Sequence, residues 1–157
     1  MAEYKPESAQ VSRRKVLAGA AAVTALSLTP GAAWATPKEA KKKLSELLGG
    51  VKPKKGRVNI SLPPLTEQGP LVPITVTVDS PMTAQDHVKS IHIVAQRNTI
   101  PEVASYHLCP ECGKAEISTR IRVAKSQVIV VGALMSDGSA YMGLARCKVA
   151  AGAGGCG

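Results

Sequence analysis

Four cysteines are the residues of this chain with the most informative chemistry: Cys109, Cys112, Cys147 and Cys156. Cys156 lies in the C-terminal segment 150–157, which otherwise contains only glycine and alanine and so has no side chain large enough to anchor in a core. Glycine loses more backbone entropy on ordering than any other residue. The segment is therefore predicted to be a flexible, solvated arm that carries an exposed thiol.

Cys156 has two interpretations. It is either a disulfide partner or a terminal remnant without a role, or it is a thiol that the arm delivers to other proteins. An unpaired exposed thiol is a liability in an oxidising compartment unless it is used, which favours the second interpretation. No basic residue is adjacent and the C-terminal carboxylate is close, so the thiol is expected to be an ordinary nucleophile. This favours a carrier over a catalyst. The arm glycines, which keep the tail thin enough for a narrow channel, are Gly152, Gly154, Gly155 and Gly157.

Cys109 and Cys112 form a Cys-Pro-Glu-Cys motif. The motif is compatible with a local disulfide or an inert turn, with a thiol-redox pair, or with half of a metal site. A zinc site would need two more ligands, and the chain has no second such motif. A redox motif of the thioredoxin type is expected to open a helix, whereas this one falls between two predicted strands. A structural disulfide or inert turn is therefore favoured.

The remaining soft ligands do not form a recognisable cluster in the sequence. Cys147 alternates with apolar residues on the last predicted strand, which predicts a buried, inert thiol. The histidines His87, His92 and His107 are spread over separate predicted strands, and the methionines show no spacing typical of a copper site. No metal site or resident cofactor is therefore predicted.

The N-terminus resembles an export signal, predicted to occupy residues 1–35. Arg13 and Arg14 precede a small-residue apolar run over 16–28, and Ala33-Trp34-Ala35 matches a small-x-small cleavage site. The paired arginines favour the twin-arginine route, which exports folded proteins, over an ordinary Sec signal. The mature domain is then predicted to be periplasmic. No other apolar run is long enough to cross a membrane, so no membrane contact is expected.

The chain carries a formal net charge of +9, which suggests anionic partners or substrates. Nucleic acid is not favoured, because the sequence has three tyrosines, no phenylalanine for base stacking and no recognisable nucleic-acid motif. A small inorganic anion or an acidic protein fits the predicted compartment better.

The predicted fold is all-β: an immunoglobulin-like antiparallel β-sandwich over residues 51–149, preceded by a short helix over 36–50. Thr36, Pro37 and Glu39 form a helix start with a capping box, and Gly49-Gly50 ends the helix. About seven short strands follow, because apolar residues alternate with polar ones between turn signals. The run 127–135 is continuously apolar, as expected of a buried strand, and Asp137-Gly138 predicts a hairpin turn after it. Turn-separated short strands of this kind are typical of a sandwich.

With these features together, the chain resembles the SoxY family, the sulfur-carrier subunits of the periplasmic thiosulfate-oxidising system. The resemblance rests on Gly154-Gly155-Cys156-Gly157 at the C-terminus, on the segment 113–122 and on Leu134-Met135-Ser136-Asp137-Gly138. The usual family ending has one more glycine, and the common pattern has only the tail cysteine.

The resemblance implies that Cys156 holds sulfur intermediates covalently while separate enzymes act on them. It implies a heterodimer with SoxZ, a second small β-sandwich. It also implies three enzyme partners: the haem c enzyme SoxAX, which conjugates thiosulfate, the manganese hydrolase SoxB, which releases sulfate, and the sulfane dehydrogenase SoxCD. The chain itself is then no enzyme, and it has no cofactor besides the sulfur it carries. The alternatives are a periplasmic thiol-disulfide oxidoreductase using Cys109 and Cys112, and a metal-binding domain.

Overall fold

The computed structural model describes residues 35–150. The predicted signal, the arm glycines and Cys156 lie outside the described residues. Within residues 35–150, no helix has the length and apolar character needed to cross a membrane.

The described chain begins with helix α2 (Pro37–Leu47). The predicted capping box is confirmed: the Glu39 amide donates to Thr36 Oγ1 at 3.3 Å, and the Thr36 amide donates to the Glu39 carboxylate at 2.6 Å. The helix ends where Gly49 and Gly50 adopt φ values of 67° and 80°, a left-handed conformation that glycine adopts without strain. The sequence thus determines both ends of this helix.

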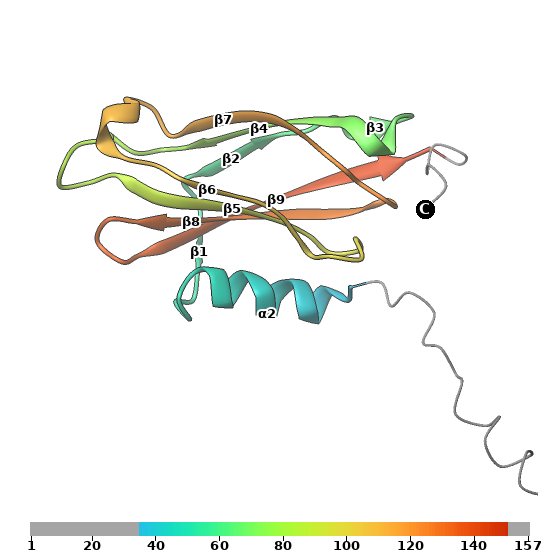
Figure 1. The fold of residues 1–157 in the computed structure, drawn as a ribbon, viewed down its shortest axis with the longest axis horizontal. Coiled ribbons are helices and arrows are strands. Elements are labelled where there is room, and N and C mark those ends of the chain that lie inside the picture. Colours follow the sequence, from blue (N-terminus) through green and yellow to red (C-terminus); the bar gives the residue numbers. More distant parts are fainter. Residues whose placement is uncertain (1–34, 151–157) are drawn as a thin grey trace, which may run out of the picture. The chain divides into compact units, whose positions relative to one another are not determined.

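The strands form two sheets that face each other, with α2 on the outer side of the larger one (Figure 1). The smaller sheet has the order β2 (Val58–Ser61), β4 (Val72–Val78), β7 (Glu116–Ile121). The larger sheet has the order β1 (Lys54–Lys55), β9 (Ala140–Val149), β8 (Gln127–Met135), β5 (Val88–Ala95), β6 (Glu102–His107), and β3 (Leu65–Thr66) also pairs with β9. Short 3₁₀ turns occur at Gly69–Leu71 and Pro110–Cys112.

The predicted β-sandwich is therefore confirmed, with one difference in its strands. Residues 35–150 contain two further strands, β1 and β3, which are two residues long and pair with β9 in a parallel direction. Segments this short carry no alternation of apolar and polar residues, so no periodicity indicates them.

The main core lies between the two sheets. In β4, the side chains of Val72, Ile74, Val76 and Val78 are buried and the residues between them are more exposed, as the alternation predicts. They pack with Ile91 and other inward-facing residues of the larger sheet into one cluster. Burial of this apolar surface supplies the main stabilisation of the sandwich.

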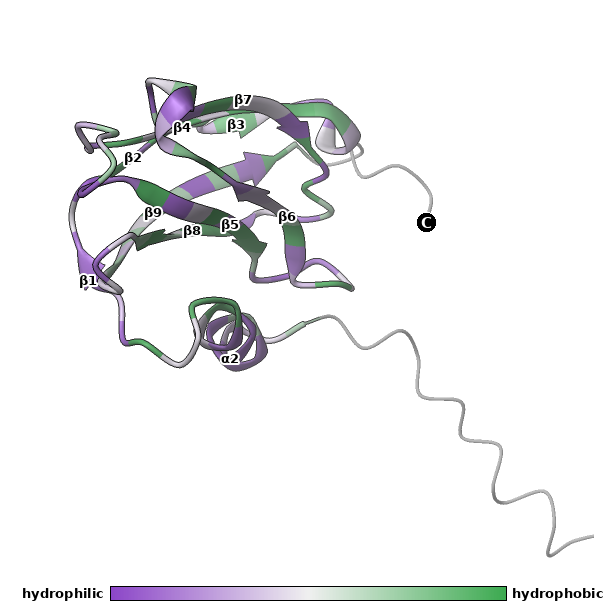
Figure 2. Cartoon of the chain, turned by 60° about the vertical axis from the view of Figure 1, so that its left-hand side comes forward, coloured by the Kyte–Doolittle hydropathy of each residue, from purple (hydrophilic) through white to green (hydrophobic). Residues whose placement is uncertain are grey.

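A second, smaller core lies between α2 and the outer face of the larger sheet. Its buried members are Ala40, Leu44, Leu48, Val94, Val130 and Ala140. Because β8 is covered on both faces, its sequence is a nearly continuous apolar run. β5 is also buried along most of its length, although Lys89, Ser90 and His92 interrupt its apolar residues. Figure 2 shows the largely hydrophobic β5 and β8 lying between α2 and the smaller sheet.

Candidate functional site

The last strand, β9, is held by neighbouring segments up to the end of the part of the chain that the structure describes. The amide of Lys148 donates to the Pro64 carbonyl at 2.9 Å, and that of Ala150 donates to the Thr66 carbonyl at 3.0 Å. On the other side, the amide of Val149 donates to Ser126 Oγ at 2.9 Å. The chain is thus held from both sides up to Ala150, and residues 151–157 start from this anchored position.

A groove of about 380 Å³ lies beside this anchor. Two separate parts of the chain bring basic side chains to it: Arg97 follows β5, and Arg146 and Lys148 lie on β9. All three residues are exposed. We call this cavity the root groove; its other lining residues are Pro37, Gln96, Ser126, Gln127, Val128 and Cys147. The sequence analysis did not identify it.

The base of the root groove is held in place by hydrogen bonds. The buried Gln127 side chain accepts from the Arg97 amide at 2.6 Å and donates to Asn98 Oδ1 at 2.8 Å. Arg97 Nη1 also donates to the Ser126 carbonyl, at 3.4 Å. The turn after β5 is therefore tied to the start of β8, and this tie positions Arg97 opposite β9.

Cys109 and Cys112 lie on an exposed 3₁₀ turn between β6 and β7, as the sequence analysis placed them. Their Sγ atoms are 3.4 Å apart and both thiols are free. The hydrogen bond with the Cys112 thiol is the main cause that raises the pKa of Cys109, and the neighbouring Glu111 raises it further. A raised pKa lowers the thiolate fraction of Cys109, so the Cys109 thiol is not activated as a nucleophile.

Cys147 is buried in the main core, as predicted, and its side chain has an exposed fraction of 0%. Burial raises the pKa of this thiol. Cys147 is also one of the residues that line the root groove. A protonated sulfur without solvent contact is chemically inert in the folded state.

Two of the three histidines are neighbours, which the sequence did not indicate. The rings of His92 and His107 meet edge to face with centroids 6.3 Å apart, because β5 and β6 pair antiparallel. His92 is buried, and its ring nitrogens contact Ser105 Oγ at 2.8 Å and Ser90 Oγ at 2.9 Å. Within residues 35–150, no three His, Cys, Asp or Glu side chains gather closely enough to hold a metal ion.

The His92 network makes the stability of the domain dependent on pH. Burial is the main cause that holds the pKa of His92 below 6.5, its value in an unstructured chain; His107 lowers it further, and Glu102 opposes the shift. Glu102 itself forms an ion pair of 3.3 Å with Lys43 of α2. Below pH 6.5 the unfolded chain therefore binds a proton at this position more readily than the folded one does.

We therefore expect the free energy of unfolding to fall as the pH drops from about 6.5 towards the lowered pKa of His92. Urea unfolding at pH values from about 7.5 to about 5, a range that spans the histidine titration, measures this free energy of unfolding. His92→Gln should weaken the dependence, whereas His87→Gln should leave it intact. An unchanged slope in the His92 variant would contradict the assignment.

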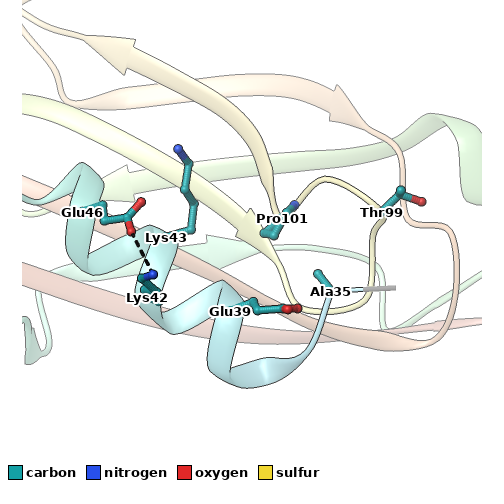
Figure 3. A pocket seen from close by; sticks show the side chains of 7 residues that line it. All are labelled: Ala35, Glu39, Lys42, Lys43, Glu46, Thr99 and Pro101. Carbon is teal, nitrogen blue, oxygen red and sulfur yellow. Dashed lines mark ion pairs between the residues drawn. The ribbon is translucent and has the colours of Figure 1, made fainter. Parts of the chain in front are cut away.

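A second hollow, of about 330 Å³, lies between α2 and the turn that joins β5 to β6 (Figure 3). Its charged residues come from the helix: Glu39, Lys42, Lys43 and Glu46. Lys42 and Glu46 pair across one helical turn at 4.0 Å, and both side chains are largely exposed. With balanced charge and no thiol or buried polar group, this hollow has no evident chemistry.

Two of the comparisons with known proteins identify the same family. The family model described as sulfur oxidation protein SoxY matches residues 44–156. The sulfur carrier protein SoxY from Chlorobium limicola f thiosulfatophilum is similar in structure, with a TM-score of 0.62 and 27% sequence identity over 73% of this chain and 99% of that one. No curated protein sequence matches the chain.

Other similar structures share the fold alone. A superoxide reductase (neelaredoxin) from Ignicoccus hospitalis has a TM-score of 0.55 and 14% identity over 74% of this chain and 94% of that one. A putative superoxide reductase from Thermotoga maritima has a TM-score of 0.54 and 18% identity over 62% of this chain and 94% of that one. Because the SoxY family model extends from helix α2 through the whole sandwich to Cys156, this chain belongs to the SoxY family of sulfur oxidation proteins.

Proposed function

We propose that this chain is a covalent carrier of sulfur intermediates in thiosulfate oxidation, and that it holds them on Cys156. The observation that carries the proposal is the family match, which runs to residue 156 and so includes the tail cysteine. Two of the other thiols are poorly suited to the carrier role, which supports the proposal. Cys147 is buried, and the pKa of Cys109 is raised by its partner Cys112.

Each step on the carrier is a reaction at sulfur. The thiol of Cys156 and thiosulfate form an S–S bond, and the electron pair and proton released pass to the haem c enzyme SoxAX. Water then cleaves the terminal S–S bond of the adduct at the manganese hydrolase SoxB, which frees sulfate and leaves a persulfide. At the dehydrogenase SoxCD the outer sulfur takes three oxygen atoms from water and gives up electrons and protons, the electrons passing to the electron acceptor of that enzyme, which leaves a sulfonate on the sulfur of Cys156. A second hydrolysis frees this group as sulfate and restores the thiol. The activating groups belong to these enzymes, so the chain is a substrate scaffold rather than an enzyme.

The proposed setting follows from the same assignment. The carrier pairs with SoxZ and works in the periplasm, after export by the twin-arginine route with the signal over residues 1–35. The anchor of β9 at Ser126, Pro64 and Thr66 supports the role of the last residues as an arm, because it fixes the point from which they extend.

Intact-mass spectrometry of the protein from cells grown on thiosulfate tests the proposal. We expect masses that correspond to added sulfur or added thiosulfate, and peptide mapping should place them on Cys156. Cells grown without reduced sulfur compounds provide the control, and a reductant should remove the added mass. Added sulfur on Cys109 or Cys112 instead, with Cys156 unmodified, would argue for the thiol-redox alternative.

A further inference from the structure

We infer that Cys109 and Cys112 form a redox modification site, whose dithiol is oxidised to an intramolecular disulfide by compounds that contain a reactive S–S bond. This class of oxidants includes polythionates and the loaded form of a sulfur carrier. Oxidation of the pair removes two thiols that would otherwise discharge the sulfur held on Cys156. This last part of the inference rests on the proposed function, whereas the disulfide itself does not.

The turn that carries the pair is fixed at both ends by the sandwich. Before the turn, the Leu108 amide donates to the Lys89 carbonyl of β5 at 3.0 Å. After it, the carbonyl of the buried Ala115 accepts from the Val78 amide of β4 at 2.9 Å. The turn thus connects the larger sheet to the smaller one, and the fold holds the two cysteines close to each other without a bond between them.

The local backbone brings the two thiols together. The amide of Cys112 donates to the Cys109 carbonyl at 3.0 Å, and that of Gly113 donates to the Pro110 carbonyl at 3.1 Å. Gly113 ends the turn with a φ of 72°, a left-handed conformation that favours glycine. The Sγ atoms are then 3.4 Å apart. A second sulfur is therefore in place to attack any S–S bond that forms on the first one.

The proposed oxidation consists of two displacements by thiol–disulfide exchange. With tetrathionate as the oxidant, one thiolate of the pair attacks a sulfur of its central S–S bond, takes over half of the molecule and releases the other half as thiosulfate. The neighbouring thiolate then attacks the sulfur of the first cysteine, forms the disulfide and releases the second thiosulfate. The pair loses two protons to solvent, and its two electrons reduce the S–S bond of the tetrathionate.

The surroundings of the pair favour the disulfide over a catalytic dithiol. The hydrogen bond with Cys112 is the largest cause that raises the pKa of Cys109, and Glu111 raises it further. A thiol with a raised pKa is a poor leaving group, so an external thiol that attacks Cys112 expels Cys109 slowly. The 3₁₀ turn is only three residues long and offers no helix N-terminus to stabilise a thiolate. Once formed, the disulfide should therefore resist reduction.

A reduced pair would be harmful to a sulfur carrier. Within residues 35–150, Cys109 and Cys112 are the only exposed cysteines, because Cys147 is buried. As a dithiol, the pair would reduce the S–S bond of the thiosulfate adduct on Cys156 of another copy. The pair would become a disulfide, thiosulfate would leave, and Cys156 would return to its thiol before any sulfate had formed. Prior oxidation of the pair therefore protects the loaded carrier.

Tetrathionate treatment of the reduced full-length chain tests the disulfide. Peptide mapping by mass spectrometry should show that the peptide with both cysteines has lost two hydrogen atoms and carries no thiosulfate. The variants Cys109→Ser and Cys112→Ser are matched controls. Each should keep one thiosulfate on its remaining cysteine, because no neighbouring thiol displaces it. Thiosulfate that persists on either cysteine of the native pair would overturn the disulfide.

A mixture of two variants tests the protection. Cys109→Ser/Cys112→Ser, loaded on Cys156 with tetrathionate, is mixed with Cys156→Ser whose pair is either reduced or oxidised. The reduced pair should discharge the loaded variant, whereas the oxidised pair should leave the discharge rate at that of the loaded variant alone. Equal discharge by both forms would overturn the protective role. Mass spectrometry verifies the loading of Cys156 separately, so a failure of the pair to react leaves the carrier function intact.

Discussion

Cys156→Ser is expected to abolish thiosulfate oxidation by the reconstituted Sox system and to reduce it to the rate without any carrier. A serine hydroxyl does not form the S–S bond on which every proposed step depends, and its oxygen is far less nucleophilic than a thiolate. The effect should therefore be a loss of turnover rather than a weaker affinity. Thiosulfate-dependent reduction of cytochrome c, measured with SoxZ and the enzyme partners present, gives the rate.

The three other cysteines provide matched controls for this experiment. Cys109→Ser and Cys112→Ser remove exposed thiols from the turn between β6 and β7 and should leave the rate largely unchanged. Cys147→Ala removes a thiol that has no solvent contact and should affect stability rather than turnover. If Cys109→Ser stopped the reaction and Cys156→Ser did not, the protein would be a thiol-disulfide oxidoreductase instead.

Local sequence signals predicted the parts of the fold that depend on local physics. The capping box at Thr36 and Glu39, the glycines after α2 and the hairpin at Asp137-Gly138 are each set by a few adjacent residues. The burial of Cys147 followed from its place in the alternation of β9. These features needed no knowledge of which strands are neighbours.

The features that the sequence did not predict depend on strand order and register. The root groove combines Arg97 with Arg146 and Lys148 because β5 and β9 both pair with β8, a neighbourhood that no local pattern indicates. The contact of His92 with His107 depends in the same way on the pairing of β5 with β6.

The comparisons show that proteins with this fold differ in function. Superoxide reductases with 14% and 18% identity share the sandwich, so the sandwich alone does not determine the chemistry. In the proposed function the carrier thiol is that of Cys156, which follows the last strand in the sequence. The sandwich contributes the end of β9, which hydrogen bonds hold in place, the basic groove beside it and the stability that both require.

That stability depends strongly on the packing of α2, and Leu44→Ala tests it. The Leu44 side chain is 4% exposed and lies against Gly132 of β8. A Cβ at position 132 would be 2.7 Å from Leu44 Cδ1, so the absence of a side chain at Gly132 is what lets the helix approach. Removing the leucine leaves a cavity there, and we expect a loss of about 2–5 kcal/mol in the free energy of unfolding. Urea titration measures it, and Leu144→Ala, at a leucine that is 52% exposed, should cost about 0.5 kcal/mol or less.

Gly132→Ala completes a double-mutant cycle that distinguishes packing from a general loss of helix stability. Alone, it should destabilise the protein by about 1–3 kcal/mol, because the added methyl group displaces Leu44. In the Leu44→Ala background the same methyl group partly fills the cavity, so the double variant should be more stable than the sum of the single effects predicts, by about 0.5–3 kcal/mol. Strictly additive effects would mean that the two side chains do not share this space, and α2 would then be held to β8 mainly by its other contacts.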